Sequence, residues 1–296
     1  MKKIIVTGAK GFIGHHCLQY LANSDFEVHA LTRSDDQSNS KNIIWHNFNI
    51  LEDDSSILFQ SIKPTHLLHL AWYTEHGKFW NSDENYKWLA ATKSLFTQFL
   101  NQGGQEILTA GSVAEYQWSS GSLKEDVSPE IPGNIYGECK LEVTNFCRDL
   151  ISKGHKIKIA RLFFPYGPGE PDTKLIPTLI NAIKNRSQSK FTDCEQVRDF
   201  LYVEDMANAI VALQNSDTLG VVNIGSGQGI KIKSIIELIK DILKKDADLD
   251  LGSIPRSPND PEELIADTDI LNNTIGWKAE YTMRQRLEKM INTNRK

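Results

Sequence analysis

The 296-residue chain has few cysteines that could form disulfide bonds, and its cysteines and histidines follow no metal-binding pattern. Its four cysteines match neither a zinc pattern nor a Cys-x-x-Cys pattern; they are Cys17, Cys139, Cys147 and Cys194. We therefore expect reduced, partly buried thiols. The eight histidines are scattered and include no His-Glu-x-x-His motif, so we expect no protein metal site.

The chain also lacks an excess of positive charge and a long apolar run. Its formal net charge is -5, so no basic field favours nucleic acid as a partner. The apolar residues after Lys2 and Lys3 end at Thr7, which is too short for the core of a signal peptide. No segment approaches the length of a membrane span. We expect a cytoplasmic protein that has no membrane partner.

The first half contains strands that alternate with helices. Short apolar runs rich in β-branched residues predict strands over 3–7, 27–32, 42–48, 65–70, 105–110 and 156–162. Helical periodicity predicts helices over 11–22, 83–102 and 134–152. This alternation predicts an α/β fold, a Rossmann-type doubly wound parallel sheet with helices on both faces.

The second half changes character after Arg161. Prolines and glycines crowd residues 165–171, which is typical of a loop. Helices are expected over 173–184 and 205–214, and a last strand over 221–224. We expect a dinucleotide-binding domain in residues 1–165, to which 199–225 return, and a smaller substrate-binding lobe in 166–198 and 226–296.

The loop after the first predicted strand carries three evenly spaced glycines, Gly8, Gly11 and Gly14. In that order they would permit a tight turn, close approach of the backbone to a pyrophosphate, and close packing of helix on sheet. The following helix N-terminus would attract phosphates. The spacing is one residue longer than the usual Gly-x-Gly-x-x-Gly fingerprint, and a purely structural turn is the alternative.

The residues after the second strand distinguish NAD from NADP. A carboxylate there binds the ribose 2′-hydroxyl of NAD, whereas an arginine favours the 2′-phosphate of NADP. Thr32 stands at the position of the acid and Arg33 follows it, while Asp35 and Asp36 come too late. We expect NADP(H), with NAD(H) as the second choice. A solvated loop cation is the alternative for Arg33.

Tyr136 and Lys140 are four residues apart at the start of a predicted helix, so they share one face. A lysine beside a phenol lowers its pKa, and the tyrosine could then exchange a proton with a substrate oxygen. Lys140 could also hold the nicotinamide ribose. Ser112 follows the fifth strand, at the sheet edge where such folds keep their sites. A surface helix pair is the alternative for Tyr136 and Lys140.

Further motifs follow in order along the chain: Asn85, Tyr116 four residues after Ser112, 161–169, 198–207, 223–227, Arg256 with Asp260, 266–267 and 276–277. Together with the glycine loop and the Tyr/Lys pair, they resemble the extended short-chain dehydrogenase/reductases. That group includes NAD(P)-dependent nucleotide-sugar epimerases, dehydratases and 4-ketoreductases.

The resemblance implies roles for individual residues. Ser112, Tyr136 and Lys140 would be the catalytic triad. The cofactor would contact Gly8, Gly11, Phe12, Ile13, Gly14, Thr32, Arg33, Asn49, Ile50, Leu70, Ala71, Tyr136, Lys140, Phe163 and Pro165. Asn49 replaces an aspartate that usually contacts adenine. The substrate would contact Trp72, Ser112, Arg198 and Arg256. The two arginines suit its diphosphate, and ordinary salt bridges are their alternative.

Three reactions of the group remain to be separated. Dehydratases carry an Asp-Glu pair where this chain has Val113 and Ala114, and Glu115 comes one residue late, so we expect it to face elsewhere. Epimerases resemble tight NAD binders with an acid after the second strand, which this chain lacks. We expect NADPH-dependent reduction of a nucleotide-linked 4-keto-6-deoxysugar at C4. An NAD-dependent 4-epimerase is the alternative, and a non-catalytic dinucleotide sensor is a remote one.

Two further expectations concern surfaces. Aromatic residues near the expected site would line a sugar or base, or else pack as an apolar lid; they are Trp72, Tyr73, Trp80 and Trp118. The predicted helices 83–102 and 134–152 resemble those that pair across a two-fold axis in the group, so we expect a homodimer. Their apolar residues could equally belong to the core.

Overall fold

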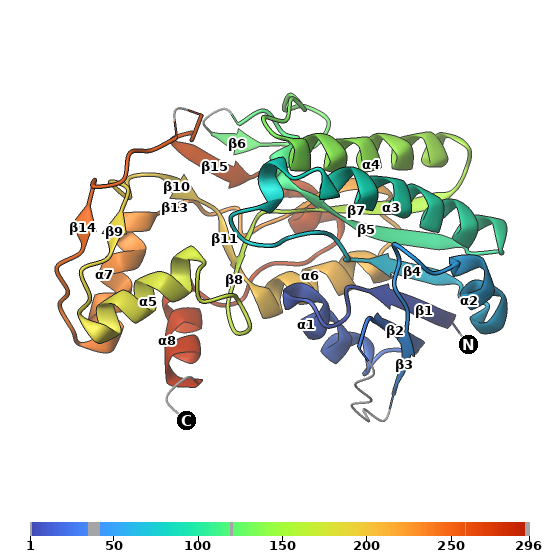
Figure 1. The fold of residues 1–296 in the computed structure, drawn as a ribbon, viewed down its shortest axis with the longest axis horizontal. Coiled ribbons are helices and arrows are strands. Elements are labelled where there is room, and N and C mark those ends of the chain that lie inside the picture. Colours follow the sequence, from blue (N-terminus) through green and yellow to red (C-terminus); the bar gives the residue numbers. More distant parts are fainter. Residues whose placement is uncertain (1, 35–41, 119–120, 258, 294–296) are drawn as a thin grey trace.

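The protein is represented by a computed structural model that describes residues 2–34, 42–118, 121–257 and 259–293 (Figure 1). A parallel seven-stranded sheet forms its centre, in the order β12-β7-β5-β4-β1-β2-β3. Its strands are β1 (Lys2–Thr7), β2 (Phe26–Thr32), β3 (Ile43–Asn47), β4 (His66–His69), β5 (Glu106–Ser112), β7 (Lys156–Leu162) and β12 (Gly220–Ile224). Continuous apolar runs such as 4–6 form these strands because both faces of the sheet are covered.

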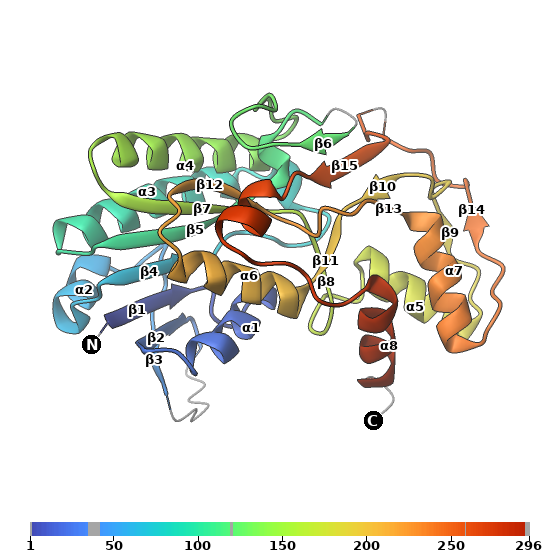
Figure 2. The ribbon, with the colours of Figure 1, turned by 180° about the vertical axis from the view of Figure 1, so that it is seen from behind.

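Helices cover the two faces of this sheet (Figures 1 and 2). One face carries α2 (Ser55–Ile62), α3 (Glu84–Asn101) and α4 (Ile135–Ser152), whose apolar residues form one buried cluster with the sheet. The other face carries α1 (Phe12–Leu21) and α6 (Val203–Asn215), which belong to a second cluster. The predicted Rossmann-type α/β fold is confirmed.

A further group of elements lies beyond the carboxyl ends of these strands (Figure 1). The helices α5 (Leu175–Asn185), α7 (Ile232–Leu243) and α8 (Met283–Thr293) share an apolar cluster of their own. The short strands around them are β8 (Phe164–Tyr166), β9 (Lys190–Phe191), β10 (Val197–Arg198), β11 (Phe200–Tyr202), β13 (Ile230–Lys231), β14 (Asp250–Leu251) and β15 (Glu263–Ala266).

Some contacts cross the expected division into domain and lobe. The strand β6 (Ser122–Leu123), from the first half of the chain, pairs with β15. The π-helical turn η3 (Ile270–Thr274) buries Leu271 in the cluster of α1 and α6, and Trp277 packs beside it. The division itself therefore stays a prediction. No helix of the described residues is long and apolar enough to cross a membrane.

Candidate active site

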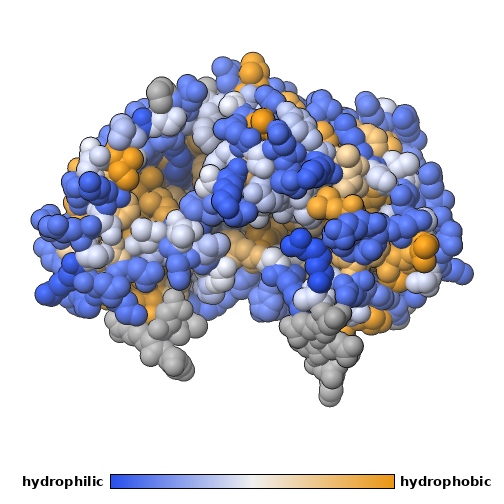
Figure 3. Space-filling view, in the orientation of Figure 1, coloured by the Kyte–Doolittle hydropathy of each residue, from blue (hydrophilic) through white to orange (hydrophobic). Residues whose placement is uncertain are grey.

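A cleft of about 1130 Å³ opens at the carboxyl ends of the central strands. In the view of Figure 3, hydrophobic residues lie at the bottom of a recess near the middle of the molecule, and hydrophilic residues surround the recess. Every residue expected in the triad and at the cofactor lines the cleft, from Gly8 in the first loop to Pro165. Of the expected substrate contacts, Trp72, Ser112 and Arg198 line it, whereas Arg256 is not among the lining residues.

The glycine loop between β1 and α1 has no room for side chains at two positions. Gly8 has φ +66°, and a Cβ there would lie 2.8 Å from the Ala71 nitrogen. A Cβ on Gly14 would lie 2.1 Å from the Gly8 carbonyl oxygen. The backbone therefore passes close to the first turn of α1, whose unpaired N–H groups suit a phosphate.

Buried polar side chains fix the backbone that faces this loop. The Thr7 hydroxyl accepts hydrogen bonds from the nitrogens of Leu70 (3.1 Å) and Ala71 (3.2 Å). His69 lies between the hydroxyls of Thr7 (2.9 Å) and Thr92 (3.0 Å). Burial lowers the pKa of His69 to about 3, with the Lys140 charge acting in the same direction. This neutral histidine ties β1 and β4 to α3.

The end of β2 carries hydroxyls and cations and no carboxylate among its described residues. Thr32 and Ser34 share a hydrogen bond (3.1 Å), and the Lys10 ammonium donates to the Ser34 hydroxyl (2.9 Å). Arg33 is exposed beside them and lines the cleft. The sequence analysis missed Lys10, although a lysine inside the glycine loop was visible. Asp35 and Asp36 lie outside the described residues.

The three expected catalytic residues meet at one wall of the cleft. Ser112 ends β5 and caps the 3₁₀ turn η2 (Val113–Glu115), with its hydroxyl accepting from the Ala114 nitrogen (3.2 Å). Tyr136 and Lys140 stand one turn apart on α4, which Asn134 caps by accepting from the Gly137 nitrogen (2.8 Å). The predicted juxtaposition of triad side chains is thus present.

The expected effect of Lys140 on Tyr136 is not seen. Burial raises the pKa of Tyr136 to about 12, and the Ser112 side chain partly offsets this. The Lys140 ammonium instead donates to the Ala110 carbonyl oxygen (2.8 Å) and stands 4.1 Å from the Trp72 ring centroid. Burial lowers the pKa of Lys140 to about 8. Desolvation therefore dominates at Tyr136, and the phenol keeps its proton at neutral pH.

Glu115 faces the interior, as expected, and does not line the cleft. Its carboxylate is fully buried and pairs with Arg161, whose Nη2 lies 2.7 Å from Oε2. It therefore does not occupy the place of a dehydratase acid.

The two arginines expected at a diphosphate occupy different surroundings. Arg198 is buried in the cleft wall, pairs with Asp260 and lies near Gln196, whose amide donates to the same aspartate (2.9 Å). Arg256 pairs instead with Asp193 (2.6 Å) and Glu262 (2.8 Å). Arg198 is placed to meet a ligand, while a substrate contact of Arg256 stays a prediction.

Aromatic rings form much of the wall around Tyr136. Phe79 and Trp80 meet its ring edge to face, at centroid distances of 4.9 Å and 5.7 Å. The buried Asn85 accepts from the Trp72 indole nitrogen (2.9 Å), which fixes that ring in the cleft. Trp118 meets Trp80 at 5.8 Å but does not line the cleft, and neither does Tyr73. Trp72 and Trp80 thus line the cleft as predicted, and a contact with a sugar or base stays a prediction.

Two charged residues of the cleft were missed. Glu170 has a buried Oε2 atom without a hydrogen-bond partner, and burial raises the pKa of its carboxyl to about 7. Lys174 stands over the Phe79 ring at 5.5 Å, and burial lowers the pKa of its ammonium. Glu170 lies within the Pro/Gly-rich loop and Lys174 follows it, and the loop gave no periodic signal for the direction of their side chains.

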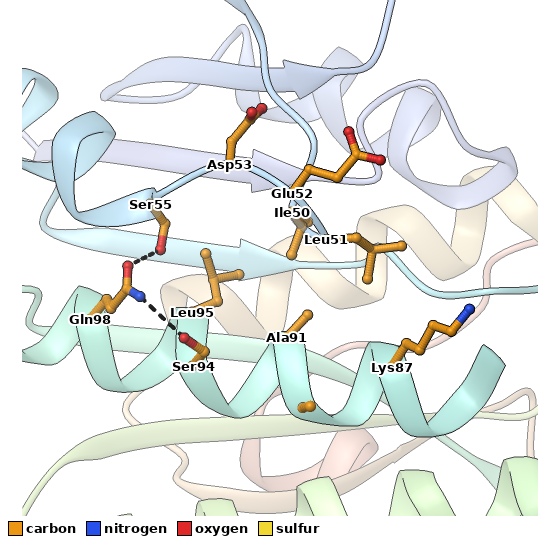
Figure 4. A pocket seen from close by; sticks show the side chains of 11 residues that line it. Ile50, Leu51, Glu52, Asp53, Ser55, Lys87, Ala91, Ser94, Leu95 and Gln98 are labelled. Atoms are coloured by element: carbon orange, nitrogen blue, oxygen red, sulfur yellow. Dashed lines mark hydrogen bonds between the residues drawn. The ribbon is translucent and has the colours of Figure 1, made fainter. Parts of the chain in front are cut away.

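A second, smaller groove of about 420 Å³ lies between the 50–55 segment and α3 (Figure 4). Gln98 bridges the hydroxyls of Ser55 and Ser94 there. The Asp53 carboxyl points away from α3, and Lys87 pairs with Glu84. Within the described part of the chain, no group of three or more His, Cys, Asp or Glu could hold a metal ion, and the four cysteines are buried, free thiols.

The chain is similar to several known proteins. The sequence profile of the NAD dependent epimerase/dehydratase family matches residues 4–225. A GDP-6-deoxy-D-mannose reductase of Pseudomonas aeruginosa is 26% identical, over 98% of this chain and 96% of that protein. A CDP-abequose synthase of Salmonella muenchen is 25% identical, over 98% and 97%. The crystal structure of a UDP-glucuronic acid 4-epimerase from Bacillus cereus, in complex with UDP-glucuronic acid and NAD, superposes with a TM-score of 0.86 at 24% identity, over 98% of both chains.

Proposed function

The chain belongs to the NAD dependent epimerase/dehydratase family, and we propose that within it the protein uses NADPH to reduce a nucleotide-linked 4-keto-6-deoxysugar at C4. The observation that carries this proposal is the end of β2. There Thr32 and Arg33, with Lys10 alongside, stand where an NAD enzyme would hold its acid. As a member of this family it is an oxidoreductase or epimerase, so the choice lies between these reactions.

The cleft residues fit a phosphorylated dinucleotide. The crowded Gly8–Gly14 contact brings bare backbone to the first turn of α1, where a pyrophosphate would bind. Arg33 and Lys10 would hold a 2′-phosphate, and the fixed backbone of Leu70 and Ala71 would line the ring system. When bound, the nicotinamide would supply the hydride that reduces the sugar ketone.

The catalytic residues would then handle one proton. Tyr136 is protonated at neutral pH because its pKa is about 12, so it can give its proton to the alkoxide that forms at C4. Ser112 would hold the same oxygen. Lys140 donates one N–H to the Ala110 carbonyl oxygen and would donate the others to the cofactor ribose.

The triad fits both reduction and epimerisation, so the end of β2 carries the choice between them. The 4-epimerase stays the second candidate because the B. cereus neighbour has that activity and was solved with NAD.

Arg198, buried in the cleft wall, would bind the diphosphate of a nucleotide sugar. A homodimer through α3 and α4 also stays a proposal.

The test is consumption of NADPH with GDP-, CDP- and dTDP-linked 4-keto-6-deoxysugars, followed at the reduced-nicotinamide absorbance band. We expect turnover with one of them and little with NADH. Tyr136→Phe should lower kcat about 10²- to 10⁴-fold, since it removes the proton donor. Conversion of a UDP-sugar to its C4 epimer, with no net NADPH use, would instead establish the 4-epimerase.

A further inference from the structure

Glu115 lies behind the triad and connects the elements that supply it. Its Oε1 atom accepts a hydrogen bond from the Ser112 nitrogen (2.6 Å), which closes a capping box around η2. Its Oε2 atom accepts from the Thr144 hydroxyl on α4 (2.7 Å). Thr144 follows Lys140 by one helical turn, as Lys140 follows Tyr136, so all three share one face of α4.

The same carboxylate is anchored from a third element. Arg161 at the end of β7 donates to Oε2 from Nε (3.2 Å) and Nη2 (2.7 Å), and its guanidinium stacks on Tyr116. Glu115 and Arg161 are both fully buried. Arg161 also reaches Glu130, 2.8 Å from Nη2, so it keeps a second carboxylate that touches neither Ser112 nor Thr144.

We propose that Glu115 is a positioning residue, which holds Ser112 against the Tyr136–Lys140 face of α4 and places a fixed negative charge behind the triad. This role rests on the proposed function of the triad. A buried carboxylate that saturates its oxygens with donors from three elements is a rigid joint, because each contact restricts a different element. Ordinary packing alone would need no charge at this position.

The charge of Glu115 has a measurable effect on Lys140. Three titratable groups act on or with Lys140: Glu115 from η2, Cys147 on α4 and His69 at the end of β4. Burial keeps His69 neutral and raises the pKa of the Cys147 thiol, so the negative group that acts on Lys140 is the Glu115 carboxylate, which is ion-paired with Arg161. Its negative charge raises the pKa of Lys140 and opposes the lowering by burial. Removing that charge should make Lys140 lose its proton at lower pH.

The experiment measures the acetylation of Lys140 by acetic anhydride as a function of pH, by mass spectrometry, in the full-length protein. Lys140 is 4% exposed and lines the cleft, so the reagent approaches it from the cleft. In Glu115→Gln we expect the half-reactive pH to fall, because the charge that raises the pKa of Lys140 is removed. Glu130→Gln is the matched control, because it removes the other partner of Arg161 and should leave the midpoint unchanged.

An unchanged midpoint in a folded Glu115→Gln protein, or an equal shift in Glu130→Gln, would overturn the proposal. If Glu115→Gln does not fold, Glu115→Asp carries the test. It keeps the charge but withdraws it by one methylene from Ser112 and Thr144, so kcat should fall about tenfold or more at unchanged KM. Wild-type kcat in that variant would overturn the positioning role. Absence of turnover in the wild type would refute the proposed function, while the Lys140 midpoint would still decide the role of Glu115.

Discussion

At the scale of single residues, cofactor choice depends on a few side chains around the adenosine end of the cleft. Lys10 reaches across from the glycine loop to Ser34, and Arg33 is exposed on the same rim. A 2′-phosphate placed there would contact two cations. A ribose 2′-hydroxyl is uncharged, so it would form no ion pair with either of them. The difference between the two nucleotides is therefore concentrated in the charge of these residues.

Replacing either cation should weaken the binding of NADPH more than the binding of NADH. We expect Arg33→Ala and Lys10→Ala each to raise the Kd of NADPH about tenfold, as for loss of one charge-assisted hydrogen bond to phosphate. The Kd of NADH should change less than about twofold. Quenching of tryptophan fluorescence on titration measures both constants. An equal rise in the Kd of NADPH and of NADH would mean that these side chains do not contact the 2′-position.

Glu170 makes a second residue-scale prediction, because its carboxyl is costly to ionise where it is buried. Its folded-state pKa of about 7 lies above the ordinary value of 4.5. The unfolded chain therefore loses this proton first, and the protein loses stability as pH rises from about 4.5 to 7. Above pH 7 the loss stays constant.

Glu170→Gln removes that penalty. We expect the variant to melt a few degrees above the wild type at pH 8, and the difference to vanish near pH 4.5. Differential scanning calorimetry at several pH values gives the comparison. A constant difference at all pH values would show that the amide packs better and that ionisation of Glu170 has no role.

Some residues of the site could be predicted from the sequence, and others could not. Ser112, Tyr136 and Lys140 were predictable because their motifs sit at fixed places relative to strands. The contact of Lys10 with Ser34 was not, since it joins two loops whose path follows only from the packed sheet. The desolvation that sets the pKa of Tyr136 likewise needs the surrounding rings of Phe79 and Trp80.

At the scale of elements, the long apolar strands and five amphipathic helices were predicted from the sequence with ends correct to within about two residues. The helix α7 was not predicted, although its apolar residues recur at helical spacing. The eight-residue α2 was missed because it spans barely two turns. The helix α8 was missed because charged and polar residues together outnumber the apolar ones in its sequence. Strands of two residues, such as β9 and β10, show no periodicity at all. Their pairing comes from tertiary packing and not from local preference.

The attachment of α8 to the sheet side is testable. Arg286 of α8 forms a two-bond ion pair with Asp205 of α6, and both side chains are largely buried. Asp205→Asn should lower the free energy of unfolding by about 3 kcal/mol, because the buried guanidinium loses its two-bond partner and keeps only the longer contact with Glu204, 3.6 Å from Nη1. Urea denaturation measures the change.

The exposed pair between Arg284 of α8 and Asp241 of α7, at 2.8 Å, is the matched control. Asp241→Asn breaks a contact of the same type in water and should cost less than about 1 kcal/mol. Similar losses in the two variants would show that burial does not decide the strength of these links.

At the scale of the whole molecule, two packed cores meet at one cleft. The sheet side supplies the glycine loop and the triad, and the 160–200 and 230–260 segments supply Glu170, Lys174, Arg198 and Asp260. The apolar cluster of α5, α7 and α8 is separate from the two clusters on the sheet. Under the proposed function, one part of the chain would carry the chemistry and the other would bind the substrate, with the cleft between them.

That arrangement gives a bound ligand a mechanical role. With the cofactor against Gly11 and the nucleotide sugar against Arg198, as proposed, the two ligands together span both cores and act as a removable cross-link between them. Thermal opening of either core would then require release of these ligands, which couples their unfolding. The substrate-loaded enzyme should resist proteolysis as one unit, whereas the empty chain is free to open first at the weaker core.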